Sequence, residues 1–430
     1  MDRPEPLGPD DLTVLATDVG PAPMHMAAVL LVDGGDDGTD AVPVAFAARA
    51  AKVPRLTQRL VRQGHGAAWV ADPGAEPARH LTTERLDGGG RRAVLDRAGR
   101  LLTTRLDPSR PLWAAHWLTG WDTSGDRRGA LVVVLHHALV DGVGGLAALG
   151  ALADDEPTVA PADPAAPRPP DPVSLRGLRA WWLGLRELGL GWRPPRPAAR
   201  TSLNLPTGAR RCLWAVSVPL APFREGARRA GGTVNDAAVA AAVGTLTAVL
   251  ATRGEHPRLL VVSVPVSRRP ADGGPAGHQV GGNHTGVLPV AVPTGLDLPA
   301  RVRHVAAATT RRKAVPRGRS SLPLGGMFRA LARAGLFRRF VEHQRLVHTF
   351  ETNLRGPASR LRIAGHEVSA MVPAAANPGN VAVSFAVLSY AGDLVVCAVT
   401  DPAVVPDPGA LADALAGQLA GVAATPARVW

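Results

Sequence analysis

The sequence predicts a mixed α/β protein built from two domains. The chain has 430 residues, which is more than a single hydrophobic core usually holds. Strand-like runs of valine and leucine alternate with alanine-rich, helix-like runs along the whole chain. Prolines crowd residues 157–172 and 193–197, and proline-dense polar sequence favours extended, poorly packed backbone. We therefore predict a first domain over 1–156, a crossover linker with one helix over 157–206, and a second domain over 207–430.

The clearest element of the first domain is an apolar run that ends in two histidines. Residues 131–135 read Leu-Val-Val-Val-Leu and are followed by His136 and His137. A continuous apolar run predicts a strand that is covered on both faces. Successive strand residues point to opposite faces, so the two histidines should meet different surroundings. We expect one of them to act on a substrate and the other to support it.

A helix is predicted directly after the histidines. Residues 143–153 are apolar and rich in alanine, and Gly142, Gly144 and Gly145 allow a sharp turn before them. Asp141 stands where an N-cap residue would. A purely structural interpretation is also open, in which Asp141 only caps the helix and both histidines are hydrogen-bonded core residues.

The linker and the second domain follow in order. We expect Trp181, Trp182 and Trp192 to pack a helix within the linker rather than to bind a ligand. Thr233 and Asp236 resemble a capping box before an apolar helix, which is short and alanine-rich for a membrane span and is therefore expected in the core. The predicted strands are 212–218, 259–266, 285–292, 381–390 and 394–400, and the predicted helices are 237–253, 301–313 and a last one that Asp407 caps and Pro408 opens.

The motif His136-His137-x-x-x-Asp141-Gly142 resembles the active-site motif of acyltransferases related to chloramphenicol acetyltransferase and to condensation domains. Its context resembles the bacterial wax ester synthase/diacylglycerol acyltransferase family. Further motifs match in order: Pro6-Leu7-Gly8-Pro9-Asp10-Asp11, Pro23-Met24-His25-Met26, Arg110-Pro111-Leu112-Trp113, Asn235-Asp236, Gly282-Asn283 and Thr352-Asn353-Leu354-Arg355-Gly356-Pro357. The family usually has Ser-Asn-Val-Pro-Gly-Pro in the last block, and this departure bears on acceptor or donor preference.

The resemblance implies two chloramphenicol acetyltransferase-like domains, each a mainly antiparallel or mixed sheet flanked by helices, with an active-site channel between them. It implies that the second histidine deprotonates the acceptor and that Asp141 holds the loop by pairing with an arginine. Asn283 and Asn353 lie in matched blocks, where they either line the channel or serve turns. We add Gly145 to the expected substrate-binding positions. Acyl-CoA is the implied co-substrate, with no bound cofactor.

The expected chemistry also follows from the groups themselves. Acyl transfer from a thioester to an alcohol needs a base, and imidazole titrates near the working pH. The sequence has no Gly-x-Ser-x-Gly elbow, which favours direct attack in a ternary complex over an acyl-enzyme. Gly142 would leave room beside the developing oxyanion.

Composition limits the partners and the cofactors. The net charge is +12 and is almost all arginine, since lysine occurs only at Lys52 and Lys313. Such a surface attracts the phosphates of coenzyme A, acidic carrier proteins or anionic lipid, whereas nucleic acid is disfavoured because no nucleic-acid-binding motif is present. The two cysteines, Cys212 and Cys397, fit buried side chains better than a disulfide, and the histidine pair lacks metal-ligand spacing. Residues 1–6 do not resemble a secretory signal, so we expect a cytoplasmic protein.

Residues 327–340 interleave apolar side chains with arginines at helical spacing. This basic amphipathic segment either lies on an inner membrane or lipid droplet surface, or packs on its own domain with a solvated arginine face. The leading hypothesis is an acyl-CoA-dependent O-acyltransferase that esterifies a long-chain alcohol or a diacylglycerol. The alternative enzyme is a specialised-metabolism or condensation-like acyltransferase that uses acyl-CoA or an acyl-carrier protein to acylate a polyketide, sugar or amine. A noncatalytic lipid-surface protein is a third hypothesis.

Overall fold

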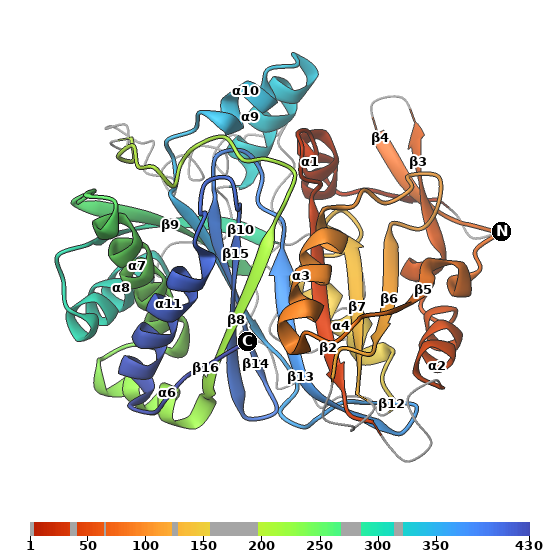
Figure 1. The fold of residues 1–430 in the computed structure, drawn as a ribbon. Helices are drawn as coiled ribbons and strands as arrows, with labels where there is room; N and C mark the ends of the chain where they lie inside the picture. Colours follow the sequence, from red (N-terminus) through yellow and green to blue (C-terminus); the bar gives the residue numbers. More distant parts are fainter. Residues whose placement is uncertain are drawn as a thin grey trace.

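The two larger of the three β-sheets in the described part of the chain lie side by side and define two lobes (Figure 1), and the third is a small sheet of residues 5–6, 66–71 and 58–63. The computed structural model describes residues 4–34, 41–63, 66–122, 128–154, 197–267, 285–313 and 321–430. The predicted linker therefore lies outside the described residues up to residue 196, with its three tryptophans.

The chain before the linker contributes these elements: β1 (Glu5–Pro6), α1 (Pro9–Thr17), β2 (His25–Val32), α2 (Ala41–Ala50), the 3-10 turn η1 (Pro54–Thr57), β3 (Gln58–Gln63), β4 (Gly66–Ala71), η2 (Pro77–His80), β5 (Leu81–Arg85), α3 (Gly90–Thr103), β6 (Trp113–Thr119), β7 (Gly129–His136) and α4 (Gly142–Ala151). The chain after it contributes β8 (Cys212–Pro219), α6 (Leu220–Arg229), α7 (Val234–Thr252), β9 (Leu259–Ser267), β10 (Thr285–Pro293), α8 (Leu298–Lys313), α9 (Ser321–Arg333), α10 (Phe337–Glu342), β11 (Thr349–Arg355), β12 (Arg362–Ile363), β13 (His366–Ala375), β14 (Val383–Tyr390), β15 (Asp393–Thr400), α11 (Pro408–Ala423) and β16 (Arg428–Val429).

The first sheet places the histidine strand near its centre. Within the described residues its strand order is β12-β13-β2-β7-β6-β5, and only the β5–β6 pair is parallel. Every residue of β7 is buried, which confirms the predicted two-sided burial. Leu131, Val133 and Leu135 belong to a core cluster on one face, while Val132 and Val134 belong to a cluster on the other.

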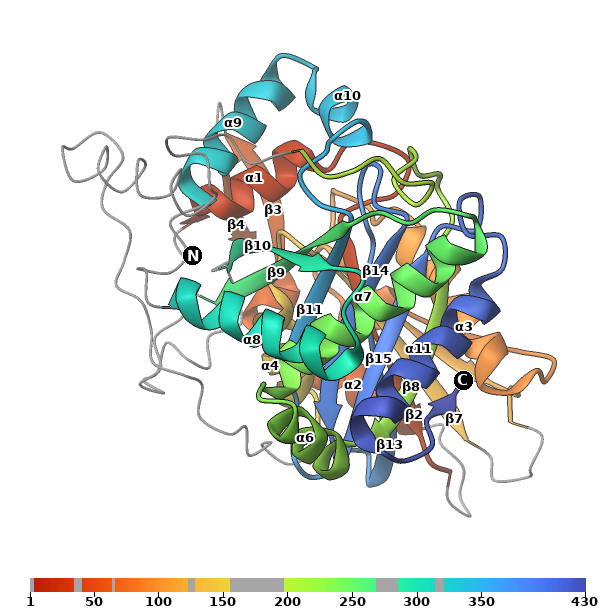
Figure 2. The same cartoon turned by 90° about the vertical axis from the view of Figure 1, so that its left-hand side faces the viewer.

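The second sheet is covered by helices on its outer face (Figures 1 and 2). Its order among the described strands is β10-β9-β11-β14-β15-β8-β16, and α6, α7, α8 and α11 pack on it and on one another. Thr233 and Asp236 form the predicted capping box at the start of α7. By length and composition α7 is the one described helix that could cross a membrane, but two thirds of it (67%) is buried inside the protein. It is a core helix, as predicted.

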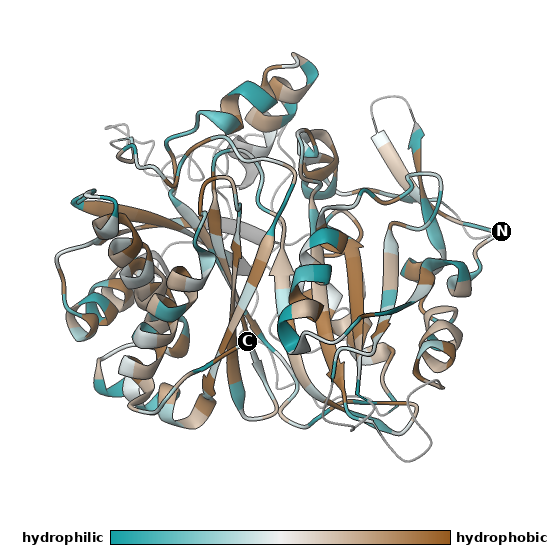
Figure 3. Cartoon of the chain, viewed as in Figure 1, coloured by the Kyte–Doolittle hydropathy of each residue, from teal (hydrophilic) through white to brown (hydrophobic). Residues whose placement is uncertain are grey.

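A third hydrophobic cluster joins the two lobes. Helix α3 contacts β2 and β7 of the first sheet and β8 of the second. Its buried side chains meet apolar residues of both sheets, among them Val29, Val132, Val372, Leu213 and Val395. Figure 3 shows the central strands of both sheets in the hydrophobic colour and much of the outer side of α3 in the hydrophilic one. The lobes therefore share a continuous apolar interior.

One part of the second half of the chain completes the first sheet. β13 pairs antiparallel with β2, from Val368 to Ala375, and β12 pairs with β13. Sheet membership thus crosses the predicted domain division, because both strands lie within residues 207–430. The loop between the two strands also contacts the end of α4, where Asp154 accepts backbone hydrogen bonds from Ala364 (2.9 Å) and Gly365 (2.6 Å).

Most predicted elements are confirmed within one to four residues, including the β14–β15 hairpin and the Asp407 cap of α11. The basic amphipathic segment, however, is not one helix. It divides into α9 and α10 because Gly335 adopts a left-handed backbone conformation (φ +69°). The first of these helices also begins at Ser321, before the start of the segment delimited from the sequence.

Candidate active site

His136 and His137, at the end of β7, point to opposite sides of the sheet. Val133, Leu135 and His137 all line a pocket between the lobes, as residues spaced by two on a strand should. His136 is not among the lining residues and is buried on the face that carries α3. Only His137 is therefore presented to a substrate from this strand end.

The helix that follows begins against the pocket. Asp141 is the N-cap of α4, and its Oδ1 accepts a hydrogen bond from the Gly144 N–H (2.8 Å). Its carbonyl accepts from Gly145 (2.7 Å), the first helical bond. Asp141, Gly142 and Gly145 all line the pocket. The positive end of the α4 dipole therefore faces the same space as the His137 ring.

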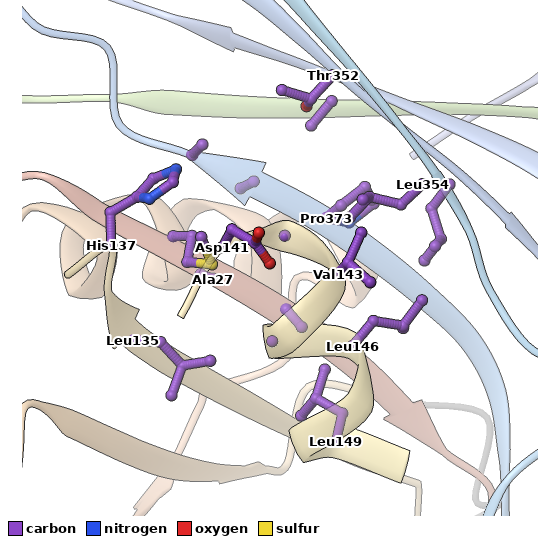
Figure 4. Close-up of a pocket in the computed structure, with 18 of the residues that line it drawn as sticks. Ala27, Leu135, His137, Asp141, Val143, Leu146, Leu149, Thr352, Leu354 and Pro373 are labelled. Carbon is purple, nitrogen blue, oxygen red and sulfur yellow. The ribbon is translucent and has the colours of Figure 1, made fainter. Parts of the chain in front are cut away.

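Both lobes build this pocket, which has a volume of about 180 Å³. Figure 4 shows the His137 ring and the Asp141 carboxylate among mostly aliphatic side chains. The lining residues are Met26, Ala27 and Ala28 of β2, Val133 and Leu135 of β7, His137 and Asp141 after it, Gly142, Val143, Gly145, Leu146 and Leu149 of α4, Pro265 of β9, Thr352, Asn353 and Leu354 of β11, Met371, Pro373, Ala374 and Ala375 of β13, and Ala386 and Leu388 of β14. An apolar cavity with a few polar groups at one side suits an acyl chain that carries a reactive head.

The second sheet opens beside the pocket. In the described part of the chain, β11 pairs with β9 only through Thr349 and Phe350, whereas it pairs with β14 along Glu351 to Arg355. Because β9 and β11 separate beyond that point, Pro265 of β9 and the consecutive residues 352–354 of β11 all reach the pocket. Pro373 of β13 is tolerated in a strand because, among the described strands, β13 pairs there with β2 alone.

Leu354 closes the space that Gly142 leaves. A methyl group on Gly142 would approach the two Leu354 methyls to 3.0 and 3.2 Å. The room expected beside Gly142 is thus bounded by a side chain from the other lobe. Leu354 is one of the residues at which the sequence departs from the family pattern.

His136 is fixed by hydrogen bonds at both ring nitrogens. Its Nδ1 accepts from the Ala138 N–H (3.0 Å), and its Nε2 lies 3.2 Å from Oδ2 of Asp18. Since Nδ1 is an acceptor, the neutral ring carries its proton on Nε2 and donates it to Asp18. Burial raises the pKa of Asp18, but the hydrogen bonds from His136 and the Met24 N–H and the charge of Arg105 outweigh it, so the pKa lies below its ordinary value.

A third histidine lies behind this pair. His25 is opposite His136 in the β2–β7 ladder, and the two rings meet edge to face with centroids 5.6 Å apart. Its Nδ1 lies 3.1 Å from the Leu102 carbonyl. Burial first, and then the neighbouring His136, lower the pKa of His25 to about 4. His25 is therefore neutral at physiological pH.

The other predicted site residues fall as follows. Asn353 and Gly145 line the pocket, and Asn283 lies outside the described residues. The pairing of Asp141 with an arginine remains a prediction. Sequence reasoning missed Asp18 and its bonds to the histidine turn, because nothing in a single sequence relates a carboxylate after α1 to a strand end more than a hundred residues later.

The described part of the chain holds no cluster of three or more histidine, cysteine, aspartate or glutamate side chains arranged for a metal. Cys212 and Cys397 are both free thiols. Burial raises the pKa of Cys397 to about 12, so this thiol is not a nucleophile at neutral pH.

Comparisons with known proteins agree over nearly the whole chain. Residues 7–194 match the family model of the wax ester synthase/diacylglycerol acyltransferase catalytic domain, and residues 281–422 match that of the WS/DGAT C-terminal domain. A probable diacylglycerol O-acyltransferase of Mycobacterium tuberculosis is 28% identical over 443 residues, covering 94% of this chain and 92% of the relative.

Solved structures show the same fold. The wax ester synthase/diacylglycerol acyltransferase from Marinobacter aquaeolei VT8 superposes with a TM-score of 0.70 at 21% identity, covering 97% of this chain and 98% of that one. The first condensation domain of the CDA synthetase superposes with a TM-score of 0.61 at 17% identity, covering 99% of both chains. The predicted fold class, with two chloramphenicol acetyltransferase-like halves, is confirmed.

Proposed function

Because the chain belongs to the wax ester synthase/diacylglycerol acyltransferase family, we propose that it transfers an acyl group from acyl-CoA to the hydroxyl group of a long-chain alcohol or a diacylglycerol. Membership makes the chain an acyl-CoA-dependent O-acyltransferase. The observation that carries the proposed chemistry is the position of His137, which faces an apolar pocket that both lobes line.

In the proposed reaction His137 is the general base. Its unprotonated ring nitrogen takes the proton from the acceptor hydroxyl as the oxygen attacks the thioester carbonyl. The C–S bond then breaks, the coenzyme A thiolate leaves, and it takes the proton back from the imidazolium. The products are an ester and free coenzyme A, so no cofactor is consumed.

The start of α4 supports the proposed stabilisation of the oxyanion. Asp141, Gly142 and His137 share the pocket wall, and the first backbone amides of a helix carry partial positive charge. Charge on the thioester oxygen develops only during attack, so fixed dipoles placed there lower the barrier without reorganising. Beyond this end the wall consists mainly of leucine, valine, alanine and methionine, which fits a fatty acyl chain or the alkyl part of the acceptor.

The first experiment compares His137→Ala with a matched control, His304→Ala. His304 lies on α8, where its Nε2 is 3.0 Å from the Ala291 carbonyl. With palmitoyl-CoA and hexadecanol or diolein, we expect His137→Ala to lose about a hundredfold to ten-thousandfold in turnover, and the control to keep it. Retained ester formation by His137→Ala would remove this assignment of the base.

The donor and the acceptor are tested by a second experiment. Palmitoyl-CoA and a palmitoylated acyl-carrier protein are each offered with hexadecanol, diolein and hexadecylamine, and products are identified by mass. The proposed function predicts esters from palmitoyl-CoA. A product that forms only from the carrier protein, or only with the amine, would favour the condensation-like alternative.

We further propose a cytoplasmic enzyme that makes peripheral contact with an inner membrane or lipid droplets through α9 and α10. These helices project beside α1 (Figure 1), and Met327 and Leu336 are 40% and 52% exposed. Arg333, Arg338 and Arg339 are exposed on the same helices. Exposed apolar and cationic side chains along one helical segment are typical of interfacial helices.

Vesicle flotation tests this contact. Reversing Arg338 and Arg339 to glutamate should weaken binding to phosphatidylserine-containing vesicles, because each arginine near an anionic surface contributes about 1 kcal/mol. The matched control reverses Arg224 and Arg228 of α6, which are also exposed. Equal flotation of both double variants and the parent would contradict the proposal.

A further inference from the structure

Asp18 lies behind the histidine turn and is linked to it directly through His136 and indirectly through Met24. It belongs to the loop between α1 and β2, and only 17% of its side chain is exposed. Its Oδ2 accepts from Nε2 of His136 (3.2 Å), and its Oδ1 accepts from the Met24 N–H (3.0 Å). One carboxylate therefore holds both a side chain of the turn and the backbone just before β2.

The Met24 backbone carries the second contact to His137. While its N–H donates to Asp18, its carbonyl accepts from the His137 N–H (2.8 Å). The Ala138 N–H donates to Nδ1 of His136 (3.0 Å). The chain of hydrogen bonds is thus closed: it runs from Asp18 through Met24 to His137, along the backbone to Ala138, and back through the His136 ring to Asp18.

Each hydrogen bond in this closed chain has a defined donor and acceptor. A carboxylate only accepts, so it can satisfy the Met24 N–H and the His136 Nε2–H at the same time. When the carboxylate accepts a hydrogen bond from Nε2–H, the neutral ring has no proton on Nδ1. Nδ1 can then accept the hydrogen bond from the Ala138 N–H. A proton on Nδ1 of a neutral His136 would instead place two donors face to face.

We propose that Asp18 is a positioning residue for acyl transfer, which fixes the His136 tautomer and the backbone of His137 and so aims the His137 ring into the pocket. This role rests on the proposed function of His137. Asp18 acts through its neighbours and is not a lining residue of the pocket.

The charged and titratable surroundings suit a permanent carboxylate. Arg105, from the loop after α3, lies 3.4 Å from Oδ2 of Asp18 and also donates to the Gly20 carbonyl (2.7 Å). His25 packs its ring against His136 on the other side. Asp18 therefore keeps its charge, and its acceptor capacity, over the pH range in which an imidazole base works.

Asp18→Asn is the decisive variant, because it preserves shape but replaces one acceptor with a donor. The amide can accept from Met24 or from His136, but not from both. We expect kcat to fall about tenfold to a hundredfold, while KM for palmitoyl-CoA and the melting temperature stay close to those of the parent. Asp33→Asn is the matched control: Asp33 follows the other end of β2, where it pairs with Arg128 (3.4 Å), and kcat should not change.

Two substitutions of His136 separate its hydrogen bond to Ala138 from its hydrogen bond to Asp18. In His136→Asn the amide replaces Nδ1 and retains an acceptor for Ala138, whereas in His136→Gln it replaces Nε2 and retains a donor for Asp18. Asp18→Asn should add no further loss of kcat to His136→Asn, because that variant already lacks the bond to Asp18. Multiplication of the two losses would show that Asp18 acts independently and would overturn the proposal.

A spectroscopic readout decides the proposal without substrate. Long-range ¹H–¹⁵N correlations of ¹⁵N-histidine protein, assigned by loss of the His136 signals in His136→Asn, should show Nε2-protonated His136 in the parent and a changed protonation state in Asp18→Asn. Unchanged kcat in Asp18→Asn, or a reduced kcat with an unchanged His136 signal, overturns the proposal. Because the signal needs no turnover, it stays informative even if His137→Ala remains active and the proposed function fails.

Discussion

Replacing Glu351 with glutamine is expected to stabilise the protein, by an amount that grows with pH. Glu351 lies on β11 one residue before the pocket-lining Thr352, and its side chain is fully buried. Within the described part of the chain, neither of its carboxylate oxygens has a hydrogen-bond partner. Burial first, and then the negative charge of Asp236, raise the pKa of Glu351 from 4.5 to about 8.

The sign of the effect follows from proton binding. Between pH 4.5 and about pH 8 the unfolded chain loses the Glu351 proton while the folded protein keeps it, so the unfolded state binds fewer protons and stability falls as pH rises. At about 1.4 kcal/mol per pH unit, the full interval corresponds to about 5 kcal/mol. Glutamine cannot ionise, so the variant should match the parent near pH 4.5 and exceed it by several kcal/mol at pH 8.

Urea unfolding of both proteins at steps from about pH 5 to about pH 8 measures this difference. The control is Glu367→Gln: Glu367 is exposed, and hydrogen bonds from Arg362 and then Arg360 lower its pKa. A group with a lowered pKa adds stability that is lost as pH falls, so its removal should give no gain at high pH. Parallel stability curves for Glu351→Gln and the parent would refute the reasoning, because they would mean that the folded protein ionises Glu351 normally.

Further substitutions test the start of α4 and the packing of α6. Asp141→Ala removes the cap of α4 and should cost about 1 kcal/mol of unfolding free energy, whereas Asp141→Asn should keep most of it in the same urea assay. Gly142→Ala presses a methyl group onto Leu354 and should reduce kcat/KM by up to about tenfold, with recovery when Leu354→Ala is added; full activity of the single variant would count against this contact. Gly226→Ala would drive a methyl group into the Val422 carbonyl and should lower stability by about 3 kcal/mol; a parent-like melting temperature would disprove that close approach.

Local patterns in the sequence predicted the elements that are determined by residues close together in the chain. The unbroken apolar run of β7, the Asp141 cap and the Thr233–Asp236 capping box depend on neighbours a few residues away, and the structure has all of them. β13 gives a weaker signal, because Pro373 interrupts its apolar residues and argues against a strand. Its pairing with β2 joins residues from opposite ends of the chain, which no local pattern encodes.

The candidate site, like the fold, was predictable where neighbouring residues determine it and not where distant segments meet. Strand alternation separates His136 from His137, and the structure places only His137 at the pocket. Leu354 stands in the block that departs from the resembled motif, but its contact with Gly142 depends on how the lobes meet. Asp18 lacked any signal, since its partners come from a strand that is distant in sequence and adjacent only after the β2–β7 ladder forms.

β13 lies far after its partner β2 in the chain, so it is synthesised much later than the strand it pairs with. Until the ribosome has released residues 366–375, the edge of β2 that faces away from β7 has no partner, and an open strand edge invites pairing with other chains. A fragment of residues 1–156 produced alone is therefore expected to aggregate. Co-expression with residues 197–430 supplies the missing strand in trans and should rescue its solubility.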